Sequence, residues 1–570
     1  MPTPASILQT IVLLVLVAAT TPFAGRWLAW VYGAPRSWRI ERVMFRLCGV
    51  TPDTEQTWRQ YAISALLFSA FGIGMSYAIM RLQDVLPFNP LHLPAVPPDL
   101  ALNTAISFST NADWQAYSGE TTMSAGTQMM ALTVQNFTCA ATAIAVLAAV
   151  IRAFARTSTE KLGNFYVDAF RSVTRVLLPL SAVVALILIW QGVPQTLDAS
   201  TTVTGLDGQT QTIALGPVAS QDAIKVVGTN GGGFFNANSA HPFENPNALT
   251  NLLQCWAMLI IPAGLVFAFG RMVGDIRQGR AIFIVMLTLL VGALALATWA
   301  ETRGNPMLAD SEIDAIPGAL SPGGNMEGKE LRLGPGASVL FEMITTATGT
   351  GAAAAMLDSF QPLGGLAAML NLSSKEVVFG GVGSGLYGML IEVVIAVFIA
   401  GLMVGRTPEY LGKKIDTKEI RLAMIIAVII PATVLGLGTL SMVLPVATGS
   451  ITAGGPHGLT QTLYAYLSTT VNNGSGFGGF GANTLYQNTA LGLALAIGRY
   501  LVMVPVLALA GSVGRKRRIP PSAGTLPTHR LTFLCLLLSS IIIVSSLTFL
   551  PVFALGPIAE HLTLAAGIGY

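Results

Sequence analysis

Ten apolar stretches, each about as long as a bilayer-crossing helix, constrain this 570-residue chain more than any other feature. About 20 apolar residues are needed to cross a hydrocarbon core of about 30 Å as a helix. Charged residues make up only 10% of the chain, against about 25% in soluble domains. The sequence therefore predicts an all-α polytopic membrane protein. The spans are expected near 5–24, 61–80, 131–151, 175–193, 252–270, 281–299, 377–404, 421–446, 488–511 and 531–553.

Basic residues are distributed unevenly over the loops between these stretches. Of the 31 Lys and Arg residues, 24 lie in the first, third, fifth, seventh and ninth loops. Positively charged loops stay on the cytoplasmic side of a membrane, so the pattern predicts that both termini lie outside. No basic residue precedes segment 5–24, which favours a retained span over a cleaved signal peptide. The basic run 515–518 beside a span is typical of lipid contact, so we expect membrane lipid as a partner and no nucleic acid.

A polar, glycine-rich phrase occurs four times between consecutive apolar stretches. It is clearest at Gly228–Gly233, and weaker copies begin at Ser109, Thr348 and Thr470. Each copy lies in a loop predicted to face outward, so the chain contains four units of span, re-entrant loop and span. The predicted organisation is a first span and cytoplasmic loop (1–60), four repeats (61–155, 173–272, 280–405 and 420–513) with loops at 109–115, 228–235, 348–352 and 470–476, and a basic cytoplasmic loop with the last span (514–570).

The composition of these four loops predicts an ion-selectivity filter. Non-helical backbone at membrane depth is tolerated only where it is buried in protein or lines a watery cavity. There, backbone carbonyls can replace the hydration shell of a potassium ion, and glycine supplies the positive φ that turns the carbonyls. Close helix packing is the alternative for a single glycine, but three consecutive glycines at 231–233 would destabilise a helix by about 1 kcal/mol each. The candidate filter residues are Thr110, Asn111, Asp113, Gln115, Thr229, Asn230, Gly231, Gly232, Thr348, Thr350, Gly351, Asn472, Asn473, Gly474 and Ser475.

Several longer phrases resemble the KdpA family, the potassium-translocating A subunits of Kdp-type potassium-transporting ATPases. They are Trp114–Glu120, Gly228–Ser239, Gly380–Met389, Gly405–Lys414 and Asn472–Ser475, and the resemblance covers essentially the whole chain. It implies a fold related to tetrameric potassium channels and the Trk/Ktr/HKT superfamily. It also implies the channel-like component of a high-affinity potassium uptake complex in the bacterial cytoplasmic (inner) membrane. The implied partners are the B subunit, which is a P-type ATPase, and the small C and F subunits.

Two features inside the spans suggest a path for the ion beyond the filter. The cluster Gly380, Gly381, Gly383 and Gly385 is expected to break the seventh span beneath the filter, and the resemblance makes this break a gating element; packing against a neighbour is the alternative. Arg499 lies near the middle of the ninth span, where ionisable residues are functional candidates; a snorkelling side chain is the alternative. Glu392 and Asp113 depart from the family pattern. Glu392 is a local partner for Arg499 or faces a hydrophilic cavity, and Asp113 would concentrate cations at the filter mouth.

The chain lacks nucleotide chemistry of its own. The nearest phosphate-loop match, 323–329, is followed by Glu330 where Ser or Thr would bind magnesium. No Asp-Lys-Thr phosphorylation motif occurs. We therefore expect potassium to be the transported ion and ATP to be used only through the partner ATPase, because this chain has no ATP-hydrolysing residues of its own.

Two other functions remain as alternatives. A potassium channel or a Trk-like transporter would share the four loops but work without ATP hydrolysis. A membrane-embedded enzyme would need clustered His or acidic residues, whereas the five His residues are scattered over the loops and the C-terminal tail. The outer segments 194–227 and 301–340, rich in Gly, Pro, Thr and Asp, are expected to form irregular caps over the pore.

Overall fold

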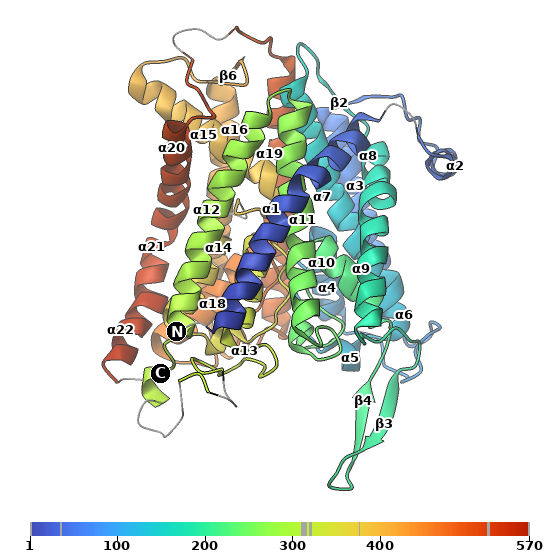
Figure 1. Cartoon of the computed structure of the whole chain (residues 1–570). Helices are drawn as coiled ribbons and strands as arrows, with labels where there is room; N and C mark the ends of the chain where they lie inside the picture. Colours follow the sequence, from blue (N-terminus) through green and yellow to red (C-terminus); the bar gives the residue numbers. More distant parts are fainter. Residues whose placement is uncertain are drawn as a thin grey trace.

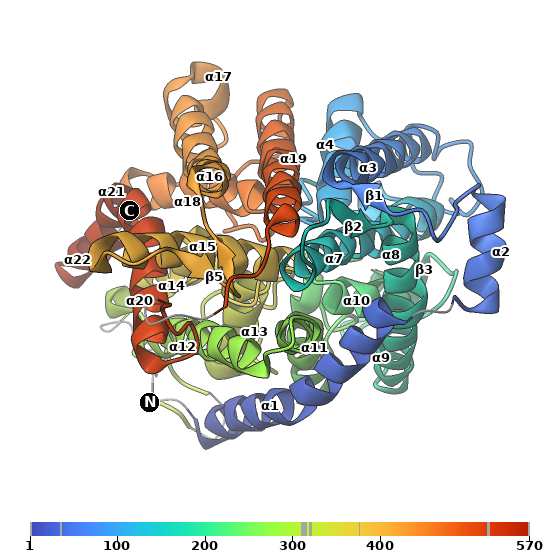
Figure 2. The same ribbon diagram turned by 90° about the horizontal axis from the view of Figure 1, so that it is seen from above.

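A computed structural model describes residues 3–34, 37–308, 316–318, 322–374, 377–520 and 525–567 of the chain. Within this part, ten helices are long and apolar enough to cross a membrane. They stand side by side as one bundle (Figures 1 and 2). The predicted all-α class with ten spans is therefore confirmed.

Nine of these helices match predicted stretches. They are α1 (Pro4–Gly33), α3 (Trp58–Arg81), the continuous run α6–η1–α7 (Ala125–Ala155), the run α8–η2–α9 (Phe165–Trp190), α11 (Ala248–Met272), α12 (Ile276–Glu301), α15 (Ser384–Val404), α16 (Thr417–Val443) and α19 (Leu485–Arg515).

The tenth span differs from the prediction. The expected stretch 531–553 lies within a longer helical run built from α20 (Leu531–Ile541), η6 (Ile542–Ser546), α21 (Leu547–Phe553), η7 (Ala554–Ile558) and α22 (Ala559–Ala565). The predicted end at 553 was wrong because helical residues continue to Ala565 across a kink at Gly556, whose φ of −91° and ψ of −107° are not helical, next to Pro557. The helix long enough to cross the membrane in this run is Thr548–Ala565.

Four short helices between the spans are absent from the sequence-based prediction. They are α4 (Pro98–Thr110), α10 (Val218–Val227), α13 (Gly334–Ala347) and α18 (Gly455–Thr470), and each ends at one of the four glycine-rich loops. Each of them begins at or beside a proline: Pro98 is a first residue, Pro217 a cap, and Pro335 and Pro456 second residues. Proline favours helix starts because its missing N–H has no partner there and its φ is already helical.

These four short helices, called pore helices below, show that the prediction of irregular caps over the pore was wrong in part. Helix α10 lies wholly inside segment 194–227, and α13 begins inside segment 301–340. The remainder of the first segment carries the hairpin β3 (Ser200–Thr204) and β4 (Thr210–Ala214). In the second segment, residues 309–315 and 319–321 lie outside the described residues.

The third repeat has a broken inner span. Helix α14 (Pro362–Ser373) ends well before α15 begins at Ser384, and the stretch 377–383 between them is not helical. Gly380 and Gly383 in this stretch have φ of 62° and 93°. Left-handed backbone of this kind cannot continue a helix. The break predicted around Gly380 is therefore present, and the predicted start of the span at 377 was too early.

The two ends of the bundle differ in composition. Both chain termini and the β3–β4 hairpin lie at one end in Figure 1. At the other end lie α2 (Arg39–Leu47), β2 (Lys161–Gly163) and β6 (Lys413–Lys414), which belong to the basic loops. β2 pairs with β1 (Gln56–Thr57), and β6 with β5 (Glu409–Tyr410).

The smaller helices are α5 (Gly119–Thr122), η3 (Asn238–Ala240), η4 (Pro306–Leu308), η5 (Leu357–Ser359) and α17 (Pro445–Thr448).

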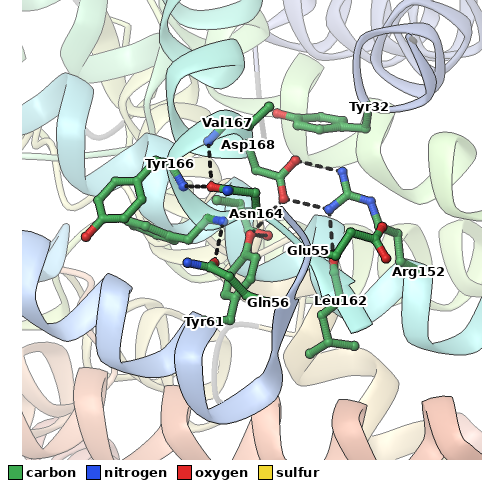
Figure 3. A network of polar contacts seen from close by, with 12 residues as sticks. Tyr32, Glu55, Gln56, Tyr61, Arg152, Leu162, Asn164, Tyr166, Val167 and Asp168 are labelled. Atoms are coloured by element: carbon green, nitrogen blue, oxygen red, sulfur yellow. Dashed lines mark hydrogen bonds and ion pairs between the residues drawn. The ribbon is translucent and has the colours of Figure 1, made fainter. Parts of the chain in front are cut away.

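A buried polar network joins α3, α7 and α8 (Figure 3). Arg152 on α7 forms a two-point ion pair with Asp168 on α8, at 2.6 and 2.7 Å. Tyr61 on α3 donates to the same carboxylate at 2.9 Å. Removing one partner of such a buried pair costs about 3–5 kcal/mol, so the network fixes α3, α7 and α8 relative to one another.

Helix α1 packs closely against α11. A Cβ added to Gly25 would lie 2.5 Å from Cβ of Phe267, and one added to Gly264 would lie 2.9 Å from Cβ of Ala24. Small residues at such crossings let two helix backbones approach one another within a membrane. The first apolar stretch is thus part of the packed bundle.

Candidate ion-selectivity filter

The four glycine-rich loops follow their pore helices with the same backbone geometry. In each loop one N–H donates to the carbonyl five residues earlier. The pairs are Ala112 to Ser107 (3.2 Å), Asn230 to Lys225 (2.9 Å), Thr350 to Thr345 (3.0 Å) and Asn473 to Ser468 (2.9 Å). This shared hydrogen bond defines which residues of the four loops are structurally equivalent.

The residues on either side of this hydrogen-bonded position have left-handed backbone in every loop. The preceding residues are Asn111 (φ 71°), Thr229 (46°), Gly349 (62°) and Asn472 (60°). The following residues are Asp113 (50°), Gly231 (102°), Gly351 (75°) and Gly474 (90°). Positive φ at every second residue lets successive carbonyls face one direction, as carbonyl rings that coordinate potassium require.

The glycines at the second of these positions bring the loops into a closed ring. A Cβ on Gly231 would collide with the Thr350 carbonyl oxygen, one on Gly351 with that of Asn473, and one on Gly474 with that of Ala112. The Asn111 side-chain amide completes the circle by donating to the Thr229 carbonyl at 2.6 Å. Each loop therefore contacts the next, and the fourth returns to the first.

Several side chains in the loops brace this ring. The Gln115 side-chain amide donates to the Gly233 carbonyl and accepts from the Gly233 N–H, at 3.0 Å each. Asn473 donates to the Thr345 carbonyl at 3.0 Å. The Asn230 amide donates to Asn111 at 3.1 Å and to the Asn136 carbonyl at 3.2 Å. The donor groups of these amides are directed to protein, which leaves the backbone carbonyls as the stronger candidates for ion ligands.

The hydroxyl-bearing candidates are also hydrogen-bonded within the protein. Thr110 donates to the Ser107 carbonyl at 2.9 Å, and Thr348 and Thr350 share a hydrogen bond of 2.7 Å. Ser475 is bonded to Tyr464 at 2.7 Å. All of these side chains are buried. The structure thus brings the predicted loop residues together in one place.

The non-helical stretch 377–383 lies directly against the ring. The N–H of Val382 donates to the Thr229 hydroxyl at 2.8 Å, and the N–H of Gly380 donates to the Ala347 carbonyl at 2.9 Å. A Cβ on Gly383 would collide with the Ala143 carbonyl, and one on Gly385 with that of Phe379. Gly383 thus allows the stretch to lie against α7, and Gly385 allows α15 to begin close to the backbone of Phe379.

Arg499 lies near the ring without belonging to it. Arg499 and Glu392 line one small cavity of about 50 Å³, together with Asn472 of the fourth loop. The Arg499 guanidinium donates to the Cys139 carbonyl at 3.3 Å, and its side chain is buried. Arg499 and Glu392 therefore share the space immediately beside the ring, between α15, α16 and α19.

Sequence reasoning missed the buried charges behind the second and third loops. Lys225 in α10 lies between Asp222 (2.5 Å) and Glu244 (2.6 Å). Glu342 in α13 accepts hydrogen bonds from the N–H groups of Ala354 (2.7 Å) and Ala355 (3.0 Å). Ionisable residues in an apolar stretch just before a filter loop were the available signal.

The ten spans and the ring of four re-entrant loops define a multi-pass membrane protein with the architecture of cation channels and transporters. The crystal structure of the potassium transporter TrkH from Vibrio parahaemolyticus matches with a TM-score of 0.52 at 14% identity, covering 88% of this chain and 98% of that one. At this identity the match supports the fold alone.

Sequence comparisons identify the family. A family model described as the potassium-transporting ATPase A subunit, KdpA, matches residues 11–562. The potassium-transporting ATPase potassium-binding subunits of Rhodospirillum centenum and Paramagnetospirillum magneticum are 52% and 53% identical, each covering 99% of both chains. That of Anaeromyxobacter dehalogenans is 53% identical over 92% of both chains. The chain belongs to the KdpA family, as its motifs predicted.

Proposed function

We propose that this protein binds potassium selectively from the outside and translocates it across the cytoplasmic membrane, as the channel-like component of an ATP-driven, high-affinity uptake complex. The observation that carries the proposal is the closed ring of four loops with the same hydrogen bond and the same positive-φ positions. The printed names of relatives at 52–53% identity support it further.

The proposed ion site is the ring itself. The residues assigned to it are those predicted from sequence, from Thr110 to Ser475, with the carbonyls of the four loops as the main ligands. Backbone carbonyls from the four loops, arranged around one axis, can replace the hydration water that potassium loses. A carbonyl ring of this kind favours potassium over sodium. The four loops belong to the predicted repeats 61–155, 173–272, 280–405 and 420–513.

The path beyond the ring is assigned to the broken third repeat. Gly380, Gly381, Gly383 and Gly385 form the gating element in this proposal, because the stretch they shape hydrogen-bonds to Thr229 of the second loop. Arg499 controls passage from the ring by its positive charge, from the cavity that it shares with Glu392. Potassium is the cargo, and it leaves the ring on this side.

The proposed setting is the bacterial inner membrane, with both termini outside. The grouping of both termini at the end of the bundle opposite the basic loops supports this orientation. In this proposal the B subunit, a P-type ATPase, hydrolyses ATP, and the small C and F subunits complete the complex.

The decisive experiment is potassium-stimulated ATP hydrolysis by the complex that co-purifies with this chain, with potassium compared against sodium. We expect stimulation by potassium alone. Gly232→Asp should weaken it strongly, because Gly232 has φ of 63° and its added Cβ would lie 3.0 Å from the Asp113 carbonyl. Gly232→Ala should act in the same direction, and Gly292→Ala is its matched control, since nothing lies within 4 Å of the Cβ added there. Potassium flux in vesicles without any co-purifying ATPase would favour a channel or a Trk-like transporter instead.

A further inference from the structure

We propose that a groove between α2 and the spans of the first two repeats binds a phospholipid with an anionic head group. One acyl chain fills the groove, and the arginines of α2 contact the head group. This site is separate from the ring of filter loops and does not depend on the proposed transport function.

The groove has the chemistry of an acyl-chain site. It encloses about 420 Å³, within the range of about 300–1,000 Å³ for ligand pockets. Its walls are apolar and include Phe45 from α2, Phe68 from α3, Phe137 and Ala141 from α7, and Phe170 from α8.

The groove also runs in the direction of a lipid chain. On the span that starts at Phe165, its lining extends from Tyr166 to Leu178, which is about 18 Å along a helix. Tyr166 belongs to α8, which lies toward the end of the bundle that carries α2 and β2 in Figure 1. The groove therefore descends from the membrane surface toward the bilayer interior, as an acyl chain does.

Helix α2 is held rigidly over the mouth of this groove. Glu41 forms a buried ion pair with Arg175 at 2.5 Å. The ring of Phe45 meets that of Phe170 edge-on at 5.8 Å, and the Arg175 guanidinium stacks 4.7 Å from the Trp38 ring. Met44 and Cys48, at the end of the same helix, line the groove. The mouth is consequently a formed feature of the fold.

The outer surface of α2 is suited to the membrane interface. Ile40, Val43 and Leu47 are 60%, 54% and 76% exposed. Such exposure of apolar side chains on a short amphipathic helix is typical of an interfacial helix that lies among lipids. Figure 2 places α2 at the periphery of the bundle, outside α8.

The positive charge of α2 favours a lipid with an anionic head group. Arg39, Arg42 and Arg46 are exposed and recur every three or four residues, so they form one stripe along α2. The acidic residue of the helix, Glu41, is turned inward to Arg175. The charged side chains exposed on α2 are therefore all arginines, and interfacial arginines attract anionic head groups.

Photo-crosslinking tests this site in the intact complex. The complex is reconstituted in phosphatidylcholine vesicles that contain phosphatidylglycerol with a diazirine midway along one acyl chain. We expect crosslinks to concentrate around Phe68, Phe137 and Phe170. The same diazirine carried by phosphatidylcholine should give about tenfold fewer of them, because two or three interfacial arginines favour the anionic head group.

Two variants separate the head-group contact from the groove. Arg42→Gln combined with Arg46→Gln should lower the phosphatidylglycerol crosslinks about tenfold, whereas the matched control Arg26→Gln with Arg280→Gln removes the same charge from exposed positions elsewhere and should change little. Met44→Trp should fill the groove and remove the crosslinks there. Equal yields from both lipids in the unmodified complex, or crosslinks spread evenly over all lipid-facing helices, would overturn the proposal.

Discussion

The second and third filter loops are braced by buried carboxylates, whereas the first and fourth are braced by neutral amides and hydroxyls. Glu244 accepts the N–H of Phe235 at 2.9 Å behind the second loop, and Glu342 accepts two N–H groups behind the third. The Asn230 amide donates to Asn111 of the first loop at 3.1 Å, and Tyr464 is hydrogen-bonded to Ser475 of the fourth at 2.7 Å. The same loop backbone is thus stabilised by carboxyl groups in two repeats and by neutral amides and hydroxyls in the other two.

The second and third pore helices also share a buried acidic position, at which Asp222 pairs with Lys225 and Glu342 binds the loop backbone. Asp222 and Glu342 each lie eight residues before the hydrogen-bonded residue of their loop, and the equivalent residues of the other two repeats are Thr104 and Ala465. A buried N–H that loses its acceptor costs about 1–3 kcal/mol, and the carboxyl groups of Glu244 and Glu342 together hold three such N–H groups, those of Phe235, Ala354 and Ala355. We infer that the carboxylate-braced half of the ring is the stiffer half.

The largest effect is expected at the glycines that close the ring, whichever half they belong to. Gly351→Ala and Gly474→Ala each place a Cβ against a neighbouring carbonyl at positive φ. Backbone strain of about 1–3 kcal/mol, added to the collision, should raise the half-saturating potassium concentration at least about tenfold. Potassium titration of ATP hydrolysis by the purified complex measures this. A normal titration for either variant would mean that its loop is not part of the ring that binds the ion.

Glu342→Ala should have the next largest effect, because it leaves two buried N–H groups without their acceptor. The cost is about 1–3 kcal/mol per unsatisfied group, and we expect weaker discrimination between potassium and sodium. Glu342→Gln retains a carbonyl oxygen at the same place and should restore most of the discrimination. If the Gln and Ala variants were equally impaired, the charge itself, and not the hydrogen bonds, would be what the third loop requires.

Asp113→Asn tests whether the carboxylate in the first loop acts on the ion. Asp113 occupies the position that is glycine in the other three loops, it is buried, and the Asn136 amide, with its nitrogen toward Asp113, donates to it at 2.8 Å. Loss of a negative charge near the ring should lower potassium affinity about threefold to tenfold. Asp113→Gly should give the same decrease although it also relieves the positive φ. An unchanged affinity in both variants would show that the first loop contributes through its backbone only.

The smallest effect is expected for Tyr464→Phe in the neutral half. The substitution removes one hydrogen bond of 2.7 Å to Ser475, worth about 1 kcal/mol. We expect about a fivefold rise in the half-saturating potassium concentration at most. An effect larger than that of Glu342→Ala would reverse the assignment of the stiffer half.

The sequence by itself determined the spans, the distribution of charge and the four loop positions. Apolar length and positive loops act locally along the chain, so 61–80 or 488–511 could be recognised without knowing any neighbour. The glycine-rich phrases also marked the loops, because Gly231 to Gly233 cannot continue a helix cheaply. The family followed from the same phrases.

Only the tertiary structure decided how the four loops correspond and what holds them. The first loop resembles the third poorly in sequence, and their equivalence rests on one N–H to carbonyl bond in each. The pore helices were missed because, at 10 to 16 residues, they are too short to read as spans. The bracing by Glu342, and by Lys225 with its two carboxylates, joins residues whose proximity is created by packing. Buried polar groups are satisfied by whichever partner the fold brings near, and a sequence does not record that proximity.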